Sequence, residues 1–444
     1  MKRTLENLHR GDSGSAMNEI ETMLSGVKPP EFYRVKYNFP SDTVTNISEA
    51  VTEALARKGT LDRILPGQTV AITGGSREIS GITIILGTFI KELLKIGAKP
   101  FIFPAMGSHG GATAQGQREV LASYGITQKT MGVPIHSSME TVKVGETPQG
   151  LPVHADKYAL GADHIIPIGR IKPHTDFKGR YESGLMKMLA IGLGKQHGAN
   201  LCHKMGMPKM SENVLAFGKE LLDACRIPFG IGIIENAFHQ THRIVAVPGE
   251  CFEEEEPDLL LQAKSLIPAI PFDKVDVIMC QQMGKEISGT GMDSNVIGRS
   301  ASLGISKPYA ERIGILDLTE KTHGNFNGVG LGDAISQRLF SKMSFETTYP
   351  NTITALEPNA VKIPPVMPTD RLCFAFCLST CTQAENGNLR VVWIKDTLSM
   401  DSFFISEALL AAADSDPLLA VEDGVFLPGF DREGTFQGFQ QAVM

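Results

Sequence analysis

Short apolar runs alternate with amphipathic segments through most of this 444-residue chain, and no other feature restricts its fold as strongly. The runs at 68–73, 99–104 and 164–168 are predicted strands, and helical patterns at 81–96 and 115–123 follow the first two. Strands that alternate with helices are typical of βαβ units with parallel strands. The sequence therefore predicts an α/β fold with mainly parallel sheets.

The length of the chain predicts two domains, because one hydrophobic core rarely serves more than about 250–300 residues. After a proline-rich stretch at 267–272, further strands are predicted at 275–280, 312–318, 372–378 and 389–394. We expect an active-site cleft between two α/β domains. The predicted divisions are a polar N-terminal extension (1–30), a cofactor-binding and catalytic domain (31–272), a C-terminal α/β domain (273–425) and a C-terminal tail (426–444).

Composition narrows the possible functions. The net charge is -7 and there is no basic block, so nucleic acid is not an expected partner. The polar N-terminus lacks the apolar core of a signal peptide, and Lys91 and Lys95 interrupt the longest apolar stretch. We therefore expect a cytoplasmic protein without a membrane segment. The acidic run at 253–256 is interpreted as solvated surface.

The seven cysteines are scattered and odd in number, so reduced thiols are expected rather than a disulfide framework. Cys373, Cys377 and Cys381 have the even spacing of a possible metal site. They lie in an apolar run, and we interpret them as small buried side chains of a strand.

The segment from Ile171 to Lys187 concentrates charged residues between two apolar runs, which indicates a site because burying an unpaired charge costs several kcal/mol. His174 follows Pro173 and has cations on both sides, so it is a candidate acid or base near a bound anion. Lys178 and Arg180 are possible anion clamps. The alternative for His174 is a surface histidine.

Lys187 begins an otherwise apolar helical run, where a desolvated amine becomes a nucleophile or covalent anchor. The alternative is a lysine whose amine reaches solvent at a helix edge. Sixteen residues later, His203 could bind a transition metal, with His197 as a competitor. The pair His239 and His242 lacks a third clear ligand for zinc.

A glycine-rich turn at 105–113 follows the second predicted strand and contains His109, a candidate acid or base. Gly107, Gly110 and Thr113 in this turn would let an anion approach free backbone amides at the helix start. The alternative for His109 is a turn histidine bonded to a carbonyl. Because ligands of α/β sheets bind where loops leave the carboxyl ends of strands, the turns at 74–77 and 105–113 and the segment 171–187 are expected to converge.

The order and spacing of these residues resemble the lactate racemase family over roughly residues 30–270: His109 in its glycine turn, Pro173-His174, Ser183-Gly184-x-x-Lys187 and His203. The resemblance implies a nickel-pincer nucleotide, held covalently by Lys187 and with its nickel bound by His203. It also implies that cofactor-maturation enzymes are partners.

The same resemblance implies that His109 and His174 alternate as acid and base, with Arg77 as the active-site arginine. Gln282 and Lys285 have the spacing of the family's substrate-binding glutamine and lysine. The implied function is racemisation or epimerisation of a small 2-hydroxy acid, in which the Cα hydride passes reversibly to the cofactor while a histidine takes the hydroxyl proton.

Three local sequences depart from those of lactate racemases, so lactate is not assumed as the substrate: Gly110 after His109, Gly75-Ser76-Arg77-Glu78, and Leu185-Met186 before Lys187. Two other functions stay open. One is a divalent-metal-dependent hydrolase or lyase that uses His174, His203 and Asp176. The other is a non-catalytic protein that binds a nucleotide or a nickel cofactor.

Overall fold

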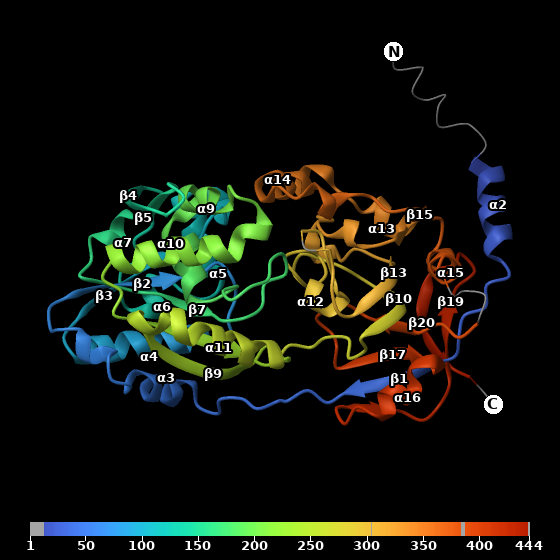
Figure 1. Cartoon of the computed structure of the whole chain (residues 1–444), viewed down its shortest axis with the longest axis horizontal. Helices are drawn as coiled ribbons and strands as arrows, with labels where there is room; N and C mark the ends of the chain where they lie inside the picture. The colour runs from blue at the N-terminus through green and yellow to red at the C-terminus, as the bar shows by residue number, and fades with distance from the viewer. Residues whose placement is uncertain (1–12, 303, 383–386, 443–444) are drawn as a thin grey trace, which may run out of the picture. The chain divides into compact units, whose positions relative to one another are not determined.

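The computed structural model describes residues 13–302, 304–382 and 387–442 and forms two compact units (Figure 1). The central unit is Pro40–Ile267. The terminal unit combines Met1–Phe39 with Pro268–Met444. Each unit contains sheets and helices, and the predicted α/β fold is confirmed. Among the described residues, no helix is long and apolar enough to cross a membrane.

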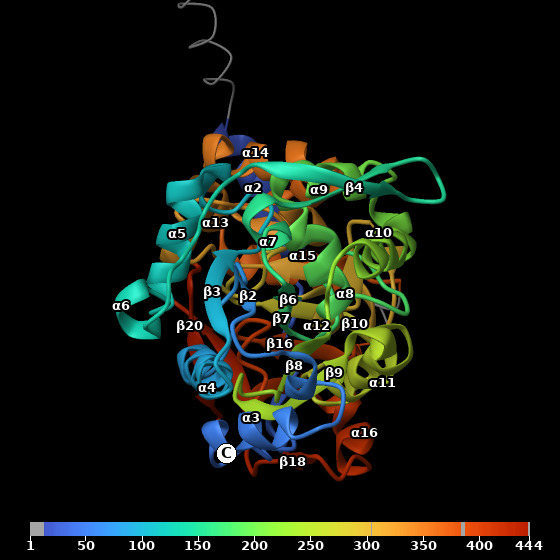
Figure 2. The same ribbon diagram turned by 90° about the vertical axis from the view of Figure 1, so that its left-hand side faces the viewer.

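A parallel sheet in the order β3-β2-β6 organises one half of the central unit (Figure 2). Its strands are β2 (Thr69–Gly74), β3 (Lys99–Pro104) and β6 (His164–Ile166). Helix α4 (Ile82–Lys95) joins the first two strands, and its buried Ile85 and Phe89 lie in the same hydrophobic cluster as Ile72. Because β2 and β3 are parallel neighbours, the turns that follow them leave the sheet at the same edge.

The third predicted strand is divided at Pro167, which has no amide hydrogen for a sheet ladder. The second part, β7 (Ile168–Arg170), pairs with β8 (Phe229–Glu235), and β8 pairs with β9 (Thr241–Pro248). The amide of Ile168 donates to the hydroxyl of Thr73 at 2.7 Å and joins the two sheets. Segment 171–187 therefore starts beside the end of β2.

Helices and a hairpin complete the central unit. They are α3 (Ile47–Leu55), α5 (Ala114–Ser123), α6 (Gln128–Met131), β4 (Thr141–Glu146), β5 (Pro152–Asp156), α7 (Lys157–Leu160), α8 (Leu185–Lys187), the π-helix η3 (Met188–Leu193), α9 (Lys195–His203), α10 (Met210–Ala224) and α11 (Phe252–Ser265). Phe217 of α10 and Leu260 of α11 are buried in one cluster with Leu185 and Leu189. This core supports the chain on both sides of Lys187.

The terminal unit contains one large sheet in the order β15-β14-β13-β10-β16-β17-β1-β19-β20, with β18 paired to β1. The strands from β15 to β16 are parallel, and the others pair antiparallel. The parallel strands are β10 (Lys274–Cys280), β13 (Tyr309–Ile315), β14 (Ala334–Ser336), β15 (Val366–Met367) and β16 (Val391–Ile394). The antiparallel strands are β1 (Phe32–Tyr37), β17 (Ser402–Ser406), β18 (Leu419–Val421), β19 (Phe426–Phe430) and β20 (Phe436–Gln441).

The helices of this unit are α2 (Ser13–Leu24), α12 (Ser294–Ile297), α13 (Gln337–Ser341), α14 (Phe345–Ala355), α15 (Asp370–Ser379) and α16 (Leu410–Asp414), and a two-stranded ribbon is formed by β11 (Arg299–Ser300) and β12 (Gly304–Ile305). The strand predicted at 372–378 is wrong, because these residues lie in helix α15. The Thr369 hydroxyl caps this helix by accepting from the amide of Leu372. A short apolar run cannot distinguish a buried helix from a buried strand. All seven cysteines are free, as expected.

The division of the chain differs from the predicted one. Strand β1, expected to open the first domain (31–272), pairs with β17 and β18 in the terminal unit. The expected tail (426–444) contributes β19 and β20, and Phe436 and Phe439 pack on Trp393. These pairings join residues far apart in sequence, which local patterns cannot reveal. Residues 1–12 of the predicted extension lie outside the described residues.

Candidate functional site

The segment 171–187 is a closed loop whose ends are joined by a backbone bridge between Lys172 and Ser183. Inside it lies the fully buried carboxylate of Glu182, which accepts from the amides of His174 at 2.7 Å and Gly179 at 3.2 Å. Lys264 pairs with the same carboxylate at 2.7 Å. Lys264 of α11 therefore compensates the charge inside the loop, and Glu182 fixes the backbone of His174.

The imidazole of His174 is held in one protonation state. The amide of Asp176 donates to Nδ1 at 3.0 Å, so the proton of the neutral ring is on Nε2. Burial lowers the pKa of His174 well below its ordinary value, and the charges of Lys187 and Lys172 lower it further. His174 is therefore a neutral hydrogen-bond donor at neutral pH.

Lys187 lies near His174 across the ring of Phe177. Its Nζ is 5.4 Å from the centre of that ring, and the His174 ring stacks on Phe177 with 4.2 Å between centroids. Within the described part of the chain, Lys187 has no hydrogen bond or ion pair, and its contact is with the ring of Phe177. Burial lowers the pKa of Lys187 to about 8, the charge of Asp176 opposes the shift, and that of Arg77 adds to it. The amine is thus partly unprotonated near neutral pH.

His203 has the state expected of a metal ligand. Its Nδ1 lies 2.6 Å from the carbonyl oxygen of Ala199, which can only accept, so Nδ1 carries the proton and Nε2 keeps its lone pair. Metal-binding histidines commonly donate their other N–H to a carbonyl in this way. Burial lowers the pKa of His203, and the nearby charge of Lys187 lowers it further. Lys187, His174 and His203 therefore form one electrostatic cluster.

The competing histidines have other surroundings. His197 is exposed and packs its ring on His154, with 4.4 Å between centroids. His242 is half-buried, and its Nδ1 lies 2.9 Å from the carbonyl oxygen of Asp42. No group of three or more His, Cys, Asp or Glu side chains in the described ranges is arranged to hold a metal ion.

The glycine turn with His109 follows β3 and packs against the helix of His203. A Cβ on Gly107 would lie 3.3 Å from that of Ala199, one turn before His203. Gly110 has a φ of 62°, and a Cβ there would lie 2.3 Å from the backbone of Gly116. The turn thus requires Gly110 for its own packing, whatever it binds.

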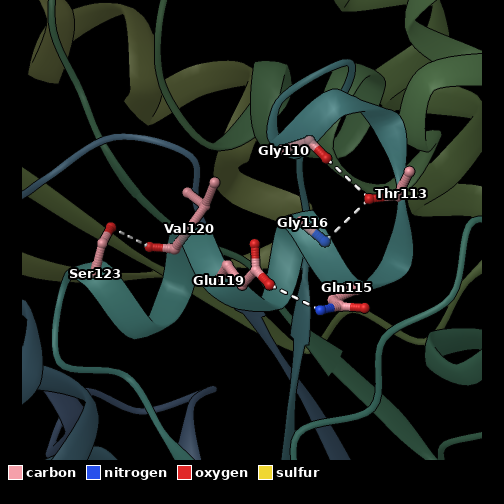
Figure 3. A pocket seen from close by; sticks show the side chains of 7 residues that line it. All are labelled: Gly110, Thr113, Gln115, Gly116, Glu119, Val120 and Ser123. Atoms are coloured by element: carbon pink, nitrogen blue, oxygen red, sulfur yellow. Dashed lines mark hydrogen bonds between the residues drawn. The ribbon is translucent and has the colours of Figure 1, made fainter.

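Figure 3 shows the hydroxyl of Thr113 between Gly110 and Gly116. It donates to the carbonyl of Gly110 and accepts from the amide of Gly116, each at 3.0 Å, and so caps α5. A shallow pocket of about 620 Å³ adjoins this cap. Its lining residues are Gly110, Thr113, Gln115, Gly116, Glu119, Val120 and Ser123.

Among the remaining candidates, Arg77 lies in the central unit, where its charge acts on Lys187, and Gln282 and Lys285 lie in the terminal unit. Arg77 follows β2, where Tyr124 donates to the carbonyl of Ser76 at 3.1 Å and fixes the turn. Gln282 and Lys285 follow β10 in the terminal unit. There, Gln282 donates to Asp396 at 2.8 Å, and Lys285 donates to Asn351 at 2.5 Å.

Sequence reasoning missed Phe177, which joins His174 to Lys187, and Lys195, which is fully buried. The Lys195 amine donates to the carbonyl of Pro104 and to Gln117, each at 2.7 Å, and Gln117 donates to the carbonyl of Gly107 at 2.8 Å. Lys195 thereby ties the His109 turn to the start of α9. The sequence signal that could have identified Lys195 is its position, a charged residue directly after the apolar run 185–193.

The interpretation of the acidic run 253–256 as solvated surface is wrong for its last member. Glu256 is 1% exposed, and its carboxylate accepts from the amide of Met186 at 2.8 Å. The run forms the first turn of α11, and its fourth residue faces the core. Helical periodicity places one residue of such a run inward.

Comparisons with known proteins support the resemblance drawn from the sequence. Residues 22–214 match the sequence model of the lactate racemase N-terminal domain. The fold is similar to that of the lactate racemase apoprotein from Thermoanaerobacterium thermosaccharolyticum, with a TM-score of 0.56 and 16% sequence identity over 83% of this chain and 99% of that one. No curated protein sequence matches the chain.

Proposed function

We propose that this chain, whose residues 22–214 match the model of the lactate racemase N-terminal domain, is a racemase or epimerase of a small 2-hydroxy acid that uses a nickel-pincer nucleotide. The observation that carries the proposal is the cluster of Lys187, His174 and His203. It combines an amine of lowered pKa with an imidazole whose Nε2 is left as a ligand atom.

The residues fit this cofactor. Lys187 would form the covalent link, because an amine with a pKa of about 8 is a nucleophile near neutral pH. His203 would bind nickel through Nε2. Gly107, Gly110 and Thr113 are proposed to lie along the nucleotide. When bound, the nickel-pincer nucleotide supplies a hydride acceptor for the substrate Cα.

The histidines are proposed to move the hydroxyl proton. In the described state, neutral His174 can donate a hydrogen bond from Nε2 to the substrate oxygen but cannot give up this proton without becoming an anion, so His109 takes the role of base first. For His174 to act as the acid, its Nδ1 must gain a proton and lose the hydrogen bond from the amide of Asp176. One base is needed on each side for inversion, because the hydroxyl proton leaves toward one histidine and the hydroxyl of the inverted product takes its proton from the other.

Arg77 is proposed to bind the substrate carboxylate, which suits a guanidinium. Gln282 and Lys285 are proposed as further substrate-binding residues. That role requires each of them to exchange its present hydrogen bond, to Asp396 or to Asn351, for one to the substrate.

Production of the chain together with cofactor-maturation enzymes tests the proposal. We expect a mass adduct on Lys187, one nickel per adduct, and inversion of a hydroxy acid detected by chiral chromatography across short-chain, sugar and aromatic acids. His203→Ala should keep the adduct and lose nickel, while His197→Ala, a matched control at an exposed position, should keep both.

The other outcomes would favour a different function or refute the proposal. Metal without an adduct would favour the hydrolase or lyase. Adduct and nickel without inversion of any acid would favour a carrier. Absence of both adduct and nickel would refute the assignment.

A further inference from the structure

Helix α11 contacts the loop 171–187 at three points along its length. The carbonyl of Glu253 accepts from the hydroxyl of Tyr181 at 2.7 Å and from Arg180 at 3.1 Å. Lys264, near the other end of α11, pairs with Glu182, which holds the amide of His174. Glu256 lies between Glu253 and Lys264 along the helix. One helix outside the matched family region therefore supports the whole loop.

The contact of Glu256 is made to the turn that carries Lys187. Helix α8 begins at Leu185 after Gly184, which has no side chain to cap it. The buried carboxylate of Glu256 takes the place of a cap, because it accepts from the amides of Met186 and Leu185. Unsatisfied amides at the start of a buried helix are costly, so this carboxylate fixes the turn.

Gly184 and Glu256 are matched in shape. A Cβ on Gly184 would lie 2.4 Å from Oε1 of Glu256. The backbone of Gly184 is extended, with a φ of 173°, so its conformation does not itself require glycine. The close approach of the carboxylate is therefore the reason for glycine here.

On this geometry, and resting on the proposed role of Lys187, we propose that Glu256 is a positioning residue that holds the Lys187 amine in its desolvated place above Phe177. Loss of the carboxylate would free the turn and let the amine reach water. The exposed neighbour Glu254 lies in the same acidic run and provides a matched control.

Trace labelling of the cofactor-free full chain with an amine-reactive anhydride, read by peptide mass spectrometry between pH 6 and 10.5, tests this proposal. The titration midpoint of Lys187 should lie at about 8 in the unsubstituted chain. In Glu256→Leu it should rise by about one unit or more toward that of a solvated lysine. Glu256→Gln, which keeps one acceptor, should raise the Lys187 midpoint by less than Glu256→Leu does. Glu254→Leu should leave the midpoint unchanged.

Gly184→Ala provides an independent variant if Glu256→Leu does not fold, because its methyl group would displace the same carboxylate. It should shift the Lys187 midpoint in the same direction. An unchanged midpoint in a folded Glu256→Leu or Gly184→Ala chain would overturn the positioning role. Since the labelling needs no cofactor, failure of cofactor attachment in the unsubstituted chain would refute the proposed function and leave this test intact.

Discussion

The loop after β7 and the loop after β10 look alike in sequence, since each follows a strand and combines glycine with charged side chains. Their polar groups are used differently. In the loop after β10, Gln282 and Lys285 donate to Asp396 and Asn351. In the loop after β7, Glu182 accepts from the backbone amide of His174, and the amine of Lys187 lies over an aromatic ring.

The difference teaches that charge density alone does not identify a reactive group. Hydrogen bonds to an ammonium group favour its charged form, whereas desolvation makes an amine lose its proton more readily. Reactivity in this chain is expected where the neighbours leave a charge unsatisfied. Four changes test this contrast.

Lys187→Met should have the largest effect, because it removes the proposed attachment point. The adduct and all racemisation should be absent in intact-mass and chiral assays. Lys285→Met, the corresponding lysine of the other loop, should keep the adduct. Equal adduct levels in the two variants would break the contrast between the loops.

His174→Asn keeps an acceptor for the amide of Asp176 and removes the proton on Nε2. Turnover should fall by about 10²–10⁴-fold, the usual contribution of general acid–base catalysis. Steady-state kinetics of the loaded enzyme would measure it. Adduct and nickel should be retained, and a change confined to KM would argue for substrate binding instead.

Glu256→Gln should alter the dependence of stability on pH. Burial raises the pKa of Glu256 from 4.5 to about 7, so the folded chain keeps a proton that the unfolded chain releases between these values. This carboxyl therefore lowers the free energy of unfolding as pH rises through that window, by roughly 3 kcal/mol.

This loss in the free energy of unfolding is absent below about pH 4.5 and complete above about pH 7. Glutamine cannot ionise, so the variant should lose less stability than the unsubstituted chain between pH 5 and 7.5 in denaturant titrations. Glu254→Gln, at the exposed position, is the control. Parallel pH profiles for the unsubstituted and Glu256→Gln chains would contradict a buried, proton-retaining carboxyl.

Asn351→Ala should have the smallest effect. It removes the acceptor of Lys285 and should lower the free energy of unfolding by about 1 kcal/mol. Thermal unfolding would measure the loss. The adduct on Lys187 should be unaffected, and its loss would show that the two loops are coupled.

The sequence by itself determined the α/β class, the central parallel strands β2, β3, β10, β13 and β16, and the choice of 171–187 as the candidate segment. Periodic apolar runs and turn glycines are local signals, so β2, α4, β3 and β10 could be predicted within a few residues. The order His109, His174, Lys187 and His203 was also readable, because a family pattern is a property of the linear chain.

Only the tertiary structure decided which polar groups are satisfied. The proton position of His174 depends on the amide of Asp176, and that of His203 on the carbonyl of Ala199. Glu256 reaches the turn of Lys187 from about seventy residues away, and β1 pairs with β17 from the opposite end of the chain. Burial and partner choice arise from packing between distant segments, and these interactions set the protonation states on which the proposed chemistry depends.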